Sequence, residues 1–268
     1  MASIGFIGAG NMAEALIKGI LSVKLYKPKD VFVSDIKAER LQHLTKEYKV
    51  AAADNAQLAA NVDVLVLSVK PQNMSDALKS IKNSLKQDSL IISIAAGKKI
   101  SSISSILGDR PIIRVMPNTP ALIGQGISAL FANEKAESFL EKAKSIFSAV
   151  GQVVVLDNEE LMDTVTAISG SGPAYYFLFS EELIKAAIQL GLPENIAKEL
   201  VLQTAKGSIL LACDADKQGK SLELLRRNVT SPGGTTEAAL KVFTEGSLGQ
   251  LIASAVKKAC EKSRQLSV

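Results

Sequence analysis

The sequence has very few of the residues that metal and redox sites need. Its 268 residues include one histidine, two cysteines and no tryptophan. A zinc site built from His and Cys ligands requires several such residues at close spacing, so the composition excludes it, and no metal site is predicted. Cys213 and Cys260 stand alone, without the spacing of a disulfide framework, and are expected to be free thiols.

Long apolar runs and a strong charge bias are missing as well. Apolar stretches such as Val64–Val69 are far too short to span a bilayer, and no signal-peptide pattern precedes the first predicted strand. The net charge is +4, with basic residues scattered among acidic ones, so neither a membrane nor a nucleic acid is an expected partner. A hydrophobic content of 47% describes a well-buried globular protein, which we expect in the cytoplasm.

A glycine motif at the start of the chain predicts a dinucleotide site. An apolar strand begins at residue 3, and Gly8, Gly10 and Ala13 follow it with the spacing G-x-G-x-x-A. In such a site the first glycine allows a sharp turn, the second lets a pyrophosphate approach the backbone, and the small third residue lets the helix pack on the strand. N–H groups at the helix start then face the anion. The predicted cofactor contacts of this turn are Ile7, Gly8, Ala9, Gly10, Asn11 and Met12.

Strands and helices alternate over the first 156 residues. Near-continuously apolar strands with helical segments between them predict an α/β domain of the Rossmann type, residues 1–156, with a parallel doubly wound sheet. The strands are expected at Ile4–Gly8, Val31–Ser34, Val62–Val69, Leu90–Ile94, Ile112–Val115, Ile127–Phe131 and Val153–Leu156. Helices between them include Ala13–Leu21, Ala38–Glu47, Met74–Leu85 and Glu134–Ala149.

No convincing strand follows Asp157, so residues 157–268 are predicted to form an all-α C-terminal domain. Its helices are apolar around much of their girth, as in Ala205–Ala212, and must bury surface beyond one packed face. We expect a helical dimer interface; burial inside the monomer is the alternative. The helices are expected at Glu159–Ile168, Pro173–Leu190, Glu194–Ala212, Leu222–Asn228, Thr235–Thr244 and Leu248–Gln265.

The end of the second predicted strand bears on the choice of dinucleotide. A carboxylate at this place accepts hydrogen bonds from a ribose 2′-OH and repels a 2′-phosphate, so Asp35 favours NAD. Ser34 can instead donate to a phosphate, and Lys37 and Arg40 are near enough to offset the carboxylate. Asp35 as a simple cap of the following helix is a further alternative. The preference between NAD(H) and NADP(H) stays open.

The carboxyl ends of the other strands should supply further cofactor contacts, because open α/β sheets bind ligands at that edge. Lys70 follows a buried strand directly and is expected near anionic cofactor groups, although a surface lysine is the alternative. Asn55 is a candidate for the adenine side unless Asp54 and Asn55 only cap a helix. Met116–Pro120 shapes the nicotinamide pocket or is a rigid loop. The predicted contacts are Asn55, Ser68, Val69, Lys70, Pro71, Ile94, Ala95, Ala96 and Asn118.

The helical half holds two segments suited to a small anionic substrate. His43 is predicted away from any reaction centre, which disfavours histidine-driven alcohol oxidation, whereas imine reduction mainly requires that the ring and its acidic group be oriented. Ser169–Tyr175 interrupts a helix, and Asn228–Thr236 opens one. Gly233 and Gly234 expose N–H groups at that helix start, which suits a carboxylate. Ser231, Thr235 and Thr236 add hydroxyls. A turn with a threonine cap is the alternative.

At these segments the chain resembles the pyrroline-5-carboxylate reductase family. The resemblance covers nearly the whole chain and rests on motifs in the family's order. They are GFIGAGNMA at Gly5–Ala13, VKP at Val69–Pro71, MPNTP at Met116–Pro120, SGSGPAY at Ser169–Tyr175 and TSPGGTT at Thr230–Thr236.

The resemblance implies hydride transfer from NAD(P)H to 1-pyrroline-5-carboxylate, giving L-proline. It implies that Thr236 is catalytic, hydrogen-bonding the ring nitrogen and helping to deliver its proton. It further implies that Ser231 and the backbone of Gly233, Gly234, Thr235 and Thr236 hold the carboxylate, with Asn228 close by. Family proteins form dimers with interlocked helical domains, often assembled into decamers. Many family members lack an acidic residue at the position of Asp35, so the resemblance does not predict whether this chain prefers NADPH or NADH.

Two other functions are alternatives for the chain. A β-hydroxyacid dehydrogenase or another imine reductase of similar plan would need a lysine acid in the helical domain. Lys185, Lys198 and Lys206 exist, but none lies in a glycine-bounded segment. A protein that only senses a dinucleotide would leave Ser231–Thr236 without a task.

Overall fold

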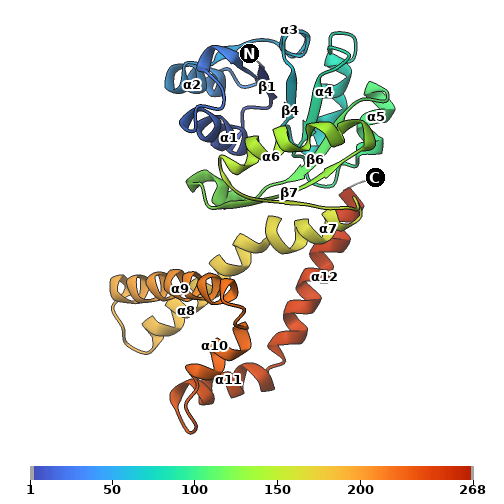
Figure 1. The fold of residues 1–268 in the computed structure, drawn as a ribbon. Coiled ribbons are helices and arrows are strands. Elements are labelled where there is room, and N and C mark those ends of the chain that lie inside the picture. Colours follow the sequence, from blue (N-terminus) through green and yellow to red (C-terminus); the bar gives the residue numbers. More distant parts are fainter. Residues whose placement is uncertain (1–2, 267–268) are drawn as a thin grey trace. The chain divides into compact units, whose positions relative to one another are not determined.

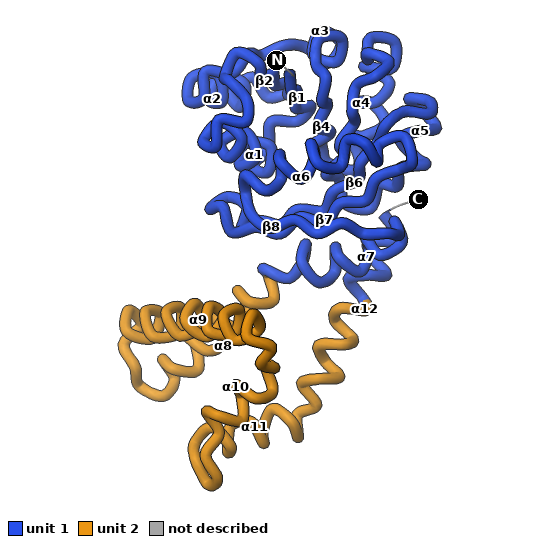
Figure 2. Tube along the Cα trace, in the orientation of Figure 1, with its two compact units in different colours: residues 1–173, 258–268 blue, residues 174–257 orange. Residues whose placement is uncertain are grey.

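The computed structural model describes residues 3–266, and the chain divides into two compact units (Figure 2). The first unit runs to Pro173 and takes in the stretch from Lys258 onward, and the second is Ala174–Lys257. The last strand of the first unit ends at Val155, next to the domain boundary predicted at residue 156. A further helical stretch to Pro173 belongs to the same unit.

One eight-stranded sheet forms the centre of the first unit, in the order β3-β2-β1-β4-β5-β6-β7-β8 (Figure 1). Every predicted strand is present, with ends shifted by a few residues. The strands are β1 Ile4–Ile7, β2 Val31–Ser34, β3 Ala51–Ala52, β4 Val64–Leu67, β5 Leu90–Ser93, β6 Ile112–Met116, β7 Gly126–Ala132 and β8 Gly151–Val155. The two-residue β3 is not predicted, because two alanines give no strand signal.

The sheet is mainly parallel, as predicted, with one antiparallel pair of strands. β7 runs antiparallel to β6, whereas the other neighbouring strands are parallel. A parallel connection needs a dozen or more residues to cross the sheet. Only a short link with one 3-10 turn, Thr119–Ile123, joins the end of β6 at Met116 to the start of β7 at Gly126. The chain therefore turns back and reverses the strand.

Alternating side chains of the central strands feed two cores, one on each face of the sheet. Phe6 and Val66 belong to the core that includes α1 and α6, and the neighbouring Ile7 and Leu67 belong to the core that includes α3, α4 and α5. All four side chains are 2% exposed or less. The first unit is thus doubly wound, as the apolar strands predict. Its helices are α1 Asn11–Ser22, α2 Ala38–Tyr48, α3 Asn55–Asn61, α4 Met74–Ile81, α5 Ile100–Leu107, α6 Leu140–Ser148 and α7 Leu161–Val165.

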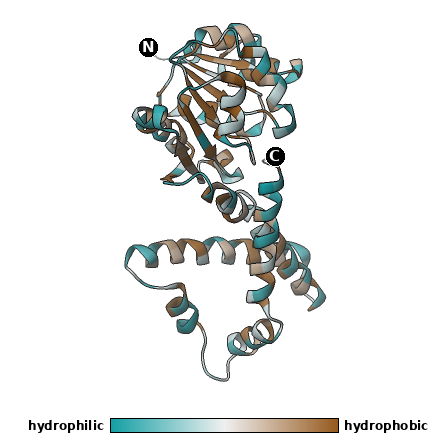
Figure 3. Ribbon diagram, turned by 90° about the vertical axis from the view of Figure 1, so that its right-hand side faces the viewer, coloured by the Kyte–Doolittle hydropathy of each residue, from teal (hydrophilic) through white to brown (hydrophobic). Residues whose placement is uncertain are grey.

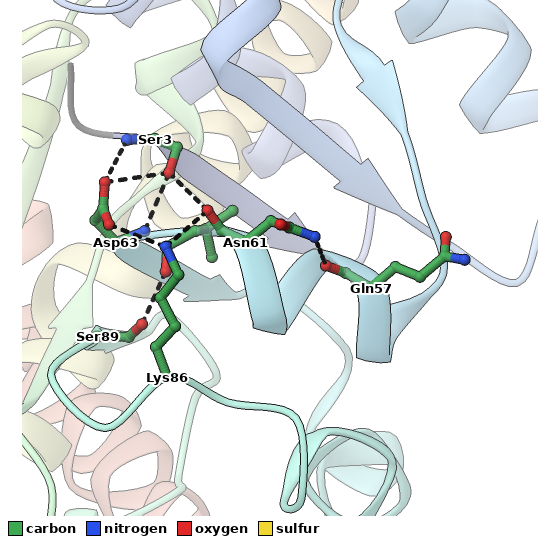
Figure 4. A network of polar contacts seen from close by, with 7 residues as sticks. Ser3, Gln57, Asn61, Asp63, Lys86 and Ser89 are labelled. Atoms are coloured by element: carbon green, nitrogen blue, oxygen red, sulfur yellow. Dashed lines mark hydrogen bonds and ion pairs between the residues drawn. The ribbon is translucent and has the colours of Figure 1, made fainter.

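The amino edge of the sheet is closed by the chain's own polar groups (Figure 4). Asp63, just before β4, accepts from the Ser3 N–H at 2.8 Å, and the Ser3 hydroxyl donates to the Asn61 carbonyl at 3.0 Å. Lys86 Nζ lies 3.2 Å from Asp63 Oδ1, and the Ser89 hydroxyl donates to the Val62 carbonyl. The Ser3 bond and the Lys86 charge outweigh partial burial and hold the pKa of Asp63 below its ordinary value.

A buried arginine ties the final turns of the chain to the same sheet. Arg114 of β6 is 3% exposed and lies 3.1 Å from the Glu159 carboxylate and 4.0 Å from that of Asp163. Asp163 in turn accepts from the Ser263 hydroxyl at 2.6 Å. Charges so deeply buried persist only when they are paired, so these contacts fix the end of the last helix within the first unit.

The second unit consists of helices joined by short loops, as predicted. Its helices are α8 Gly172–Gln189, α9 Glu194–Lys217, α10 Leu222–Asn228, α11 Thr235–Glu245 and α12 Leu248–Leu266, of which α8 begins and α12 ends in the first unit. Between Ala174 and Lys257 only Ala197 and Ala215 are buried apolar residues. Apolar residues instead lie along exposed helix surfaces, in contrast to the brown strands of the sheet in Figure 3. Within residues 3–266, no helix combines the length and apolarity that crossing a membrane requires.

Candidate functional site

The carboxyl edge of the sheet brings the predicted cofactor residues together. The glycine turn follows β1, and the remaining predicted residues lie at or just after the ends of β2, β3, β4, β5 and β6. Together with β1, these strands lie side by side in the order β3-β2-β1-β4-β5-β6. They are Ser34 and Asp35 after β2, Asn55 after β3, Ser68, Val69, Lys70 and Pro71 after β4, Ile94, Ala95 and Ala96 after β5, and Asn118 after β6. Parallel strands place these ends at one edge, where such sheets bind ligands.

The two glycines of the turn differ in what requires them. Gly8 has φ +96°, and a Cβ there would lie 2.7 Å from the carbonyl carbon and oxygen of Ser68. The Gly8 N–H donates to the Ser34 carbonyl and the Ser68 hydroxyl donates to the Gly8 carbonyl, at 2.8 and 2.6 Å. Gly10 has an ordinary φ of −73°, and a Cβ there would meet nothing within 4 Å. The fold therefore needs Gly8, whereas Gly10 leaves open space in front of the backbone.

This turn fits a dinucleotide. Gly10 is the N-cap of α1, and no side chain caps the helix start. The N–H groups of Asn11 and Met12 therefore begin a helix of twelve residues without the usual side-chain acceptor. A pyrophosphate beside Gly10 would be met by these donors and by the positive end of the helix dipole.

Asp35 holds the glycine turn and does not cap the helix after it. Its Oδ2 accepts from the Ala9 N–H at 2.6 Å and its Oδ1 accepts from the Lys37 N–H at 2.8 Å. The N-cap of α2 is Lys37, without a side-chain hydrogen bond. The cap alternative for Asp35 is therefore wrong.

Polar side chains continue along the edge. The Ser34 hydroxyl donates to Asn55 Oδ1 at 2.7 Å, and the Asn55 amide donates to the Ser80 hydroxyl at 2.9 Å. Asp54, rather than Asn55, caps α3 by accepting from the Gln57 N–H. This leaves Asn55 at the edge, beside the residues that follow β2.

Lys70 and Asn118 bracket the remaining part of the edge. Lys70 is exposed at the start of a 3-10 turn and pairs with no acidic residue in the described part of the chain. Asn118 Oδ1 accepts from the Ile127 N–H at 2.9 Å and so braces the link between β6 and β7. Lys70 thus offers a free cation at the edge, while Asn118 has a structural bond as well.

Two predicted motif segments meet inside the first unit. Thr166–Gly170 forms one π-helical turn between α7 and α8. Such turns are rare in proteins, but many of those that occur lie at functional sites. A side chain at Gly170 would overlap the end of the Met116 side chain. Gly170 therefore lets this π-helical turn pack against the Met116 side chain.

In the second unit, Asn228–Thr236 forms a helix end, a loop and a new helix start. Asn228 ends α10, and Gly233, with φ +71°, leads into Gly234, the N-cap of α11. Gly234 supplies no side-chain cap, so the N–H groups of Thr235 and Thr236 begin the helix without one. Ser231 is exposed and Thr236 is half-buried. The N–H groups of Gly233 and Gly234, predicted to be open to a carboxylate, instead donate to the Glu237 carboxylate and to the Ser231 carbonyl. The helix-start N–H groups of Thr235 and Thr236 and the neighbouring hydroxyls still suit a small carboxylate.

The sequence predicts no role for Glu237 and Glu14, and for Arg40 it predicts only a charge that offsets Asp35. Glu237 accepts from the Gly233 N–H at 2.8 Å and fixes the loop before α11. A glutamate three residues after an N-cap is a known local signal that would have found it. Arg40 donates to the Ala9 carbonyl of the glycine turn and to the Glu14 carboxylate, and no local pattern links residues so far apart in the sequence. Among residues 3–266 there is no cluster of His, Cys, Asp and Glu that would hold a metal ion.

Comparisons with known proteins place these features in one family. A family model described as pyrroline-5-carboxylate reductase dimerisation matches residues 159–266, and one described as NADP oxidoreductase, coenzyme F420-dependent, matches residues 3–97. The pyrroline-5-carboxylate reductase of Pseudomonas aeruginosa is 42% identical over 267 residues, covering 98% of this chain and 96% of its own. The corresponding enzyme of Synechocystis is 41% identical over 98% of this chain and 97% of its own.

Solved structures agree with this placement. A pyrroline-5-carboxylate reductase from Coxiella burnetii superposes with a TM-score of 0.90 at 38% identity, covering 100% of this chain and 99% of the other. The Plasmodium falciparum pyrroline carboxylate reductase with NADP bound gives 0.89 at 34% identity, with 100% and 98% covered.

Proposed function

The chain belongs to the pyrroline-5-carboxylate reductase family, and from that premise we propose how its residues reduce 1-pyrroline-5-carboxylate to L-proline, the last step of proline biosynthesis. It is an NAD(P)H-dependent oxidoreductase. The observation that carries the proposal is the full-length similarity to curated reductases. The motifs at Gly5–Ala13 and at Thr230–Thr236 are both present in the chain. A β-hydroxyacid dehydrogenase or another imine reductase is not favoured.

The first unit binds the dinucleotide at the carboxyl edge of its sheet. The N–H groups of Asn11 and Met12 would hold the pyrophosphate beside Gly10, and Lys70 would add a positive charge. Ser34, Asp35 and Asn55 would meet the adenosine end, and Ile94–Ala96 and Asn118 the nicotinamide end. When bound, the reduced nicotinamide supplies the hydride.

The second unit orients the substrate through Asn228–Thr236. The N–H groups of Thr235 and Thr236 and the Ser231 hydroxyl would donate to the carboxylate, and Asn228 lies at the start of the same segment. The Thr236 hydroxyl would hydrogen-bond the ring nitrogen of the imine. With the ring nitrogen protonated, the hydride would add to the imine carbon, which becomes C5 of proline, the π electron pair would move to nitrogen, and the proton already on that nitrogen would remain there. The support for this assignment is the uncapped helix start and the hydroxyls that share it.

The same premise extends to assembly and location. The dimerisation domain of the family lies in residues 159–266, so self-association through the helical half follows. We include in the proposal a further assembly into decamers. We also include a cytoplasmic location, where thiols such as those of Cys213 and Cys260 stay reduced. Sedimentation of the purified protein measures the assembly directly.

The role of Thr236 has a direct test. Thr236→Val removes the hydroxyl at nearly constant volume. It should raise the activation free energy by roughly 2–4 kcal/mol and so lower kcat, because the lost hydrogen bond is made to the reacting nitrogen. Oxidation of NADPH and NADH with 1-pyrroline-5-carboxylate measures it. Thr236→Ser keeps the hydroxyl and should retain most of the activity. An unchanged kcat in Thr236→Val would remove Thr236 from the mechanism.

A further inference from the structure

The middle residue of the glycine turn is held by both of its backbone groups. Ala9 is fully buried, and its N–H donates to Asp35 Oδ2 at 2.6 Å. Its carbonyl accepts from Arg40 Nε at 2.8 Å. Buried backbone groups require partners, and here both partners are side chains from outside the turn. Asp35 follows β2 and Arg40 lies on α2, so residues from the β2–α2 segment hold the glycine turn in its shape.

Arg40 is itself fixed by Glu14. Its Nη2 lies 2.5 Å from Glu14 Oε2, and the two side chains are 28% and 22% exposed. Glu14 also accepts from His43 Nε2 at 2.7 Å and from the Tyr48 hydroxyl at 3.2 Å. The planar guanidinium thus spans two acceptors at once, a geometry that a lysine ammonium does not reproduce.

This cluster also settles a charge conflict. Glu14 lies in the first turn of α1, the helix whose start is to receive an anion. A bare carboxylate there would repel a pyrophosphate. Partial burial raises the pKa of Glu14, but the hydrogen bonds from Arg40 and His43 outweigh it, and the pKa lies below its ordinary value. The carboxyl is therefore charged and needs Arg40 beside it.

We propose that Arg40, held by Glu14, is a positioning residue for cofactor binding: it fixes the Ala9 carbonyl while Asp35 fixes the Ala9 N–H, so the glycine turn has its pyrophosphate-binding shape before the cofactor arrives. A turn that is already ordered loses less entropy on binding. The contacts of Arg40 involve the shared backbone of the site and no group that distinguishes NADPH from NADH. Its loss should therefore weaken both cofactors alike.

Arg40→Ala tests this by direct titration of NADPH and NADH, followed by the fluorescence of the reduced nicotinamide without substrate. The inference rests on the proposed dinucleotide site, and binding without turnover separates its failure from failure of the proposed reaction. Both dissociation constants should rise about tenfold, the loss of one charged hydrogen bond. In turnover, KM for both cofactors should rise by a similar factor while kcat at saturating cofactor falls far less.

Two further variants grade the effect. Arg40→Lys keeps the charge without the fork and should lie between the wild type and Arg40→Ala. Glu14→Gln weakens the anchor of Arg40 but also removes the carboxylate charge that opposes the pyrophosphate, so both dissociation constants should change by less than about threefold. Arg40→Lys, the milder change at Arg40 itself, keeps the test valid if Arg40→Ala does not fold.

The matched control is Arg110→Ala. Arg110 also donates to backbone carbonyls of the first unit, with Nε at 3.0 Å from Leu107 and Nη1 at 2.8 Å from Lys86, but it precedes β6 and lies at the amino edge. It should lower the unfolding temperature without changing either dissociation constant. Unchanged binding in Arg40→Ala would overturn the proposal. A loss confined to NADPH would also overturn it, since Arg40 would then contact the 2′-phosphate.

Discussion

The two units of this chain solve the burial problem in different ways. The sheet unit buries its apolar residues within itself, and the side chains of Phe6, Leu65 and Phe147 have no exposed surface. The helical unit buries only Ala197 and Ala215 and leaves most of its large apolar side chains exposed in the single chain. A surface of that kind marks an interaction site. The difference teaches that one unit is complete as a monomer and the other requires a second copy, as its family match to a dimerisation domain indicates.

Leu210→Glu should break this comparison with the largest effect. Leu210 lies on α9 and is 60% exposed in the single chain. If a second copy covers it, the substitution buries an unpaired charge and costs about 3–5 kcal/mol of dimer stability. Sedimentation should then show monomers, and reductase activity should be lost.

Val23→Glu is the control for that change. Val23 is 57% exposed, nearly the same as Leu210, but it belongs to the sheet unit just after α1. It should leave the assembly and the activity unchanged. Equal behaviour of the two variants would contradict the division between a complete unit and one that needs a partner.

The glycine turn gives a second test, inside the sheet unit. Gly8→Ala places a Cβ at φ +96° and against the Ser68 carbonyl, and should cost about 2–4 kcal/mol of unfolding free energy. Gly10→Ala should change the unfolding free energy by less than about 0.5 kcal/mol, because no atom lies near the new methyl group. It should nevertheless weaken NADPH and NADH binding at least about tenfold, by standing where the pyrophosphate approaches.

Denaturant unfolding and cofactor titration of both glycine variants check this prediction. Its sharpest outcome is the contrast, with one glycine required by the fold and the other by the ligand. A Gly10→Ala protein that binds both cofactors normally would remove the glycine turn from the cofactor site.

Asp35→Asn sharpens the account of cofactor choice. The amide keeps an acceptor oxygen for the Ala9 N–H and removes the charge that repels a 2′-phosphate. The ratio of kcat/KM for NADPH to that for NADH should rise about tenfold, about 1.4 kcal/mol. Steady-state kinetics with both cofactors measure it. An unaltered ratio would leave Asp35 with its structural bonds to Ala9 and Lys37 alone.

Local signals explain which parts of the fold were predictable. The strands, the glycine turn and the helix after Gly234 follow from short patterns of apolar and small residues. The direction of β7 depends on the length of its connection, which propensity does not encode. The Ala–Ala strand β3 exists only because it pairs with β2.

The site divides in the same way. The predicted cofactor residues gather at one edge because topology brings strand ends together, whereas Arg40 and Glu14 act through contacts between separate helices. The Ser263–Asp163 bond likewise joins residues a hundred positions apart. Such pairs become visible only in the folded chain.

The smallest expected effect concerns the amino edge, where the sheet unit closes itself without a ligand. The pKa of Asp63 in the folded protein lies below its ordinary value, so its bonds to Ser3 and Lys86 stabilise the fold at pH values above that ordinary pKa. This contribution is lost as pH falls through the lowered pKa. It should stay under about 1 kcal/mol, because the Asp63 side chain is 44% exposed and solvent screens the charge.

Asp63→Asn removes that titration. Its unfolding free energy, measured by denaturant at several pH values, should lie slightly below the wild type at neutral pH and converge with it in acid. Cofactor affinity should be the same in both proteins, because Asp63 lies at the edge opposite the glycine turn. A parallel pH dependence in the two proteins would assign the acid sensitivity to other carboxylates. Altered cofactor binding would show that the two edges of the sheet are coupled, and that the sheet unit is not as self-contained as its core suggests.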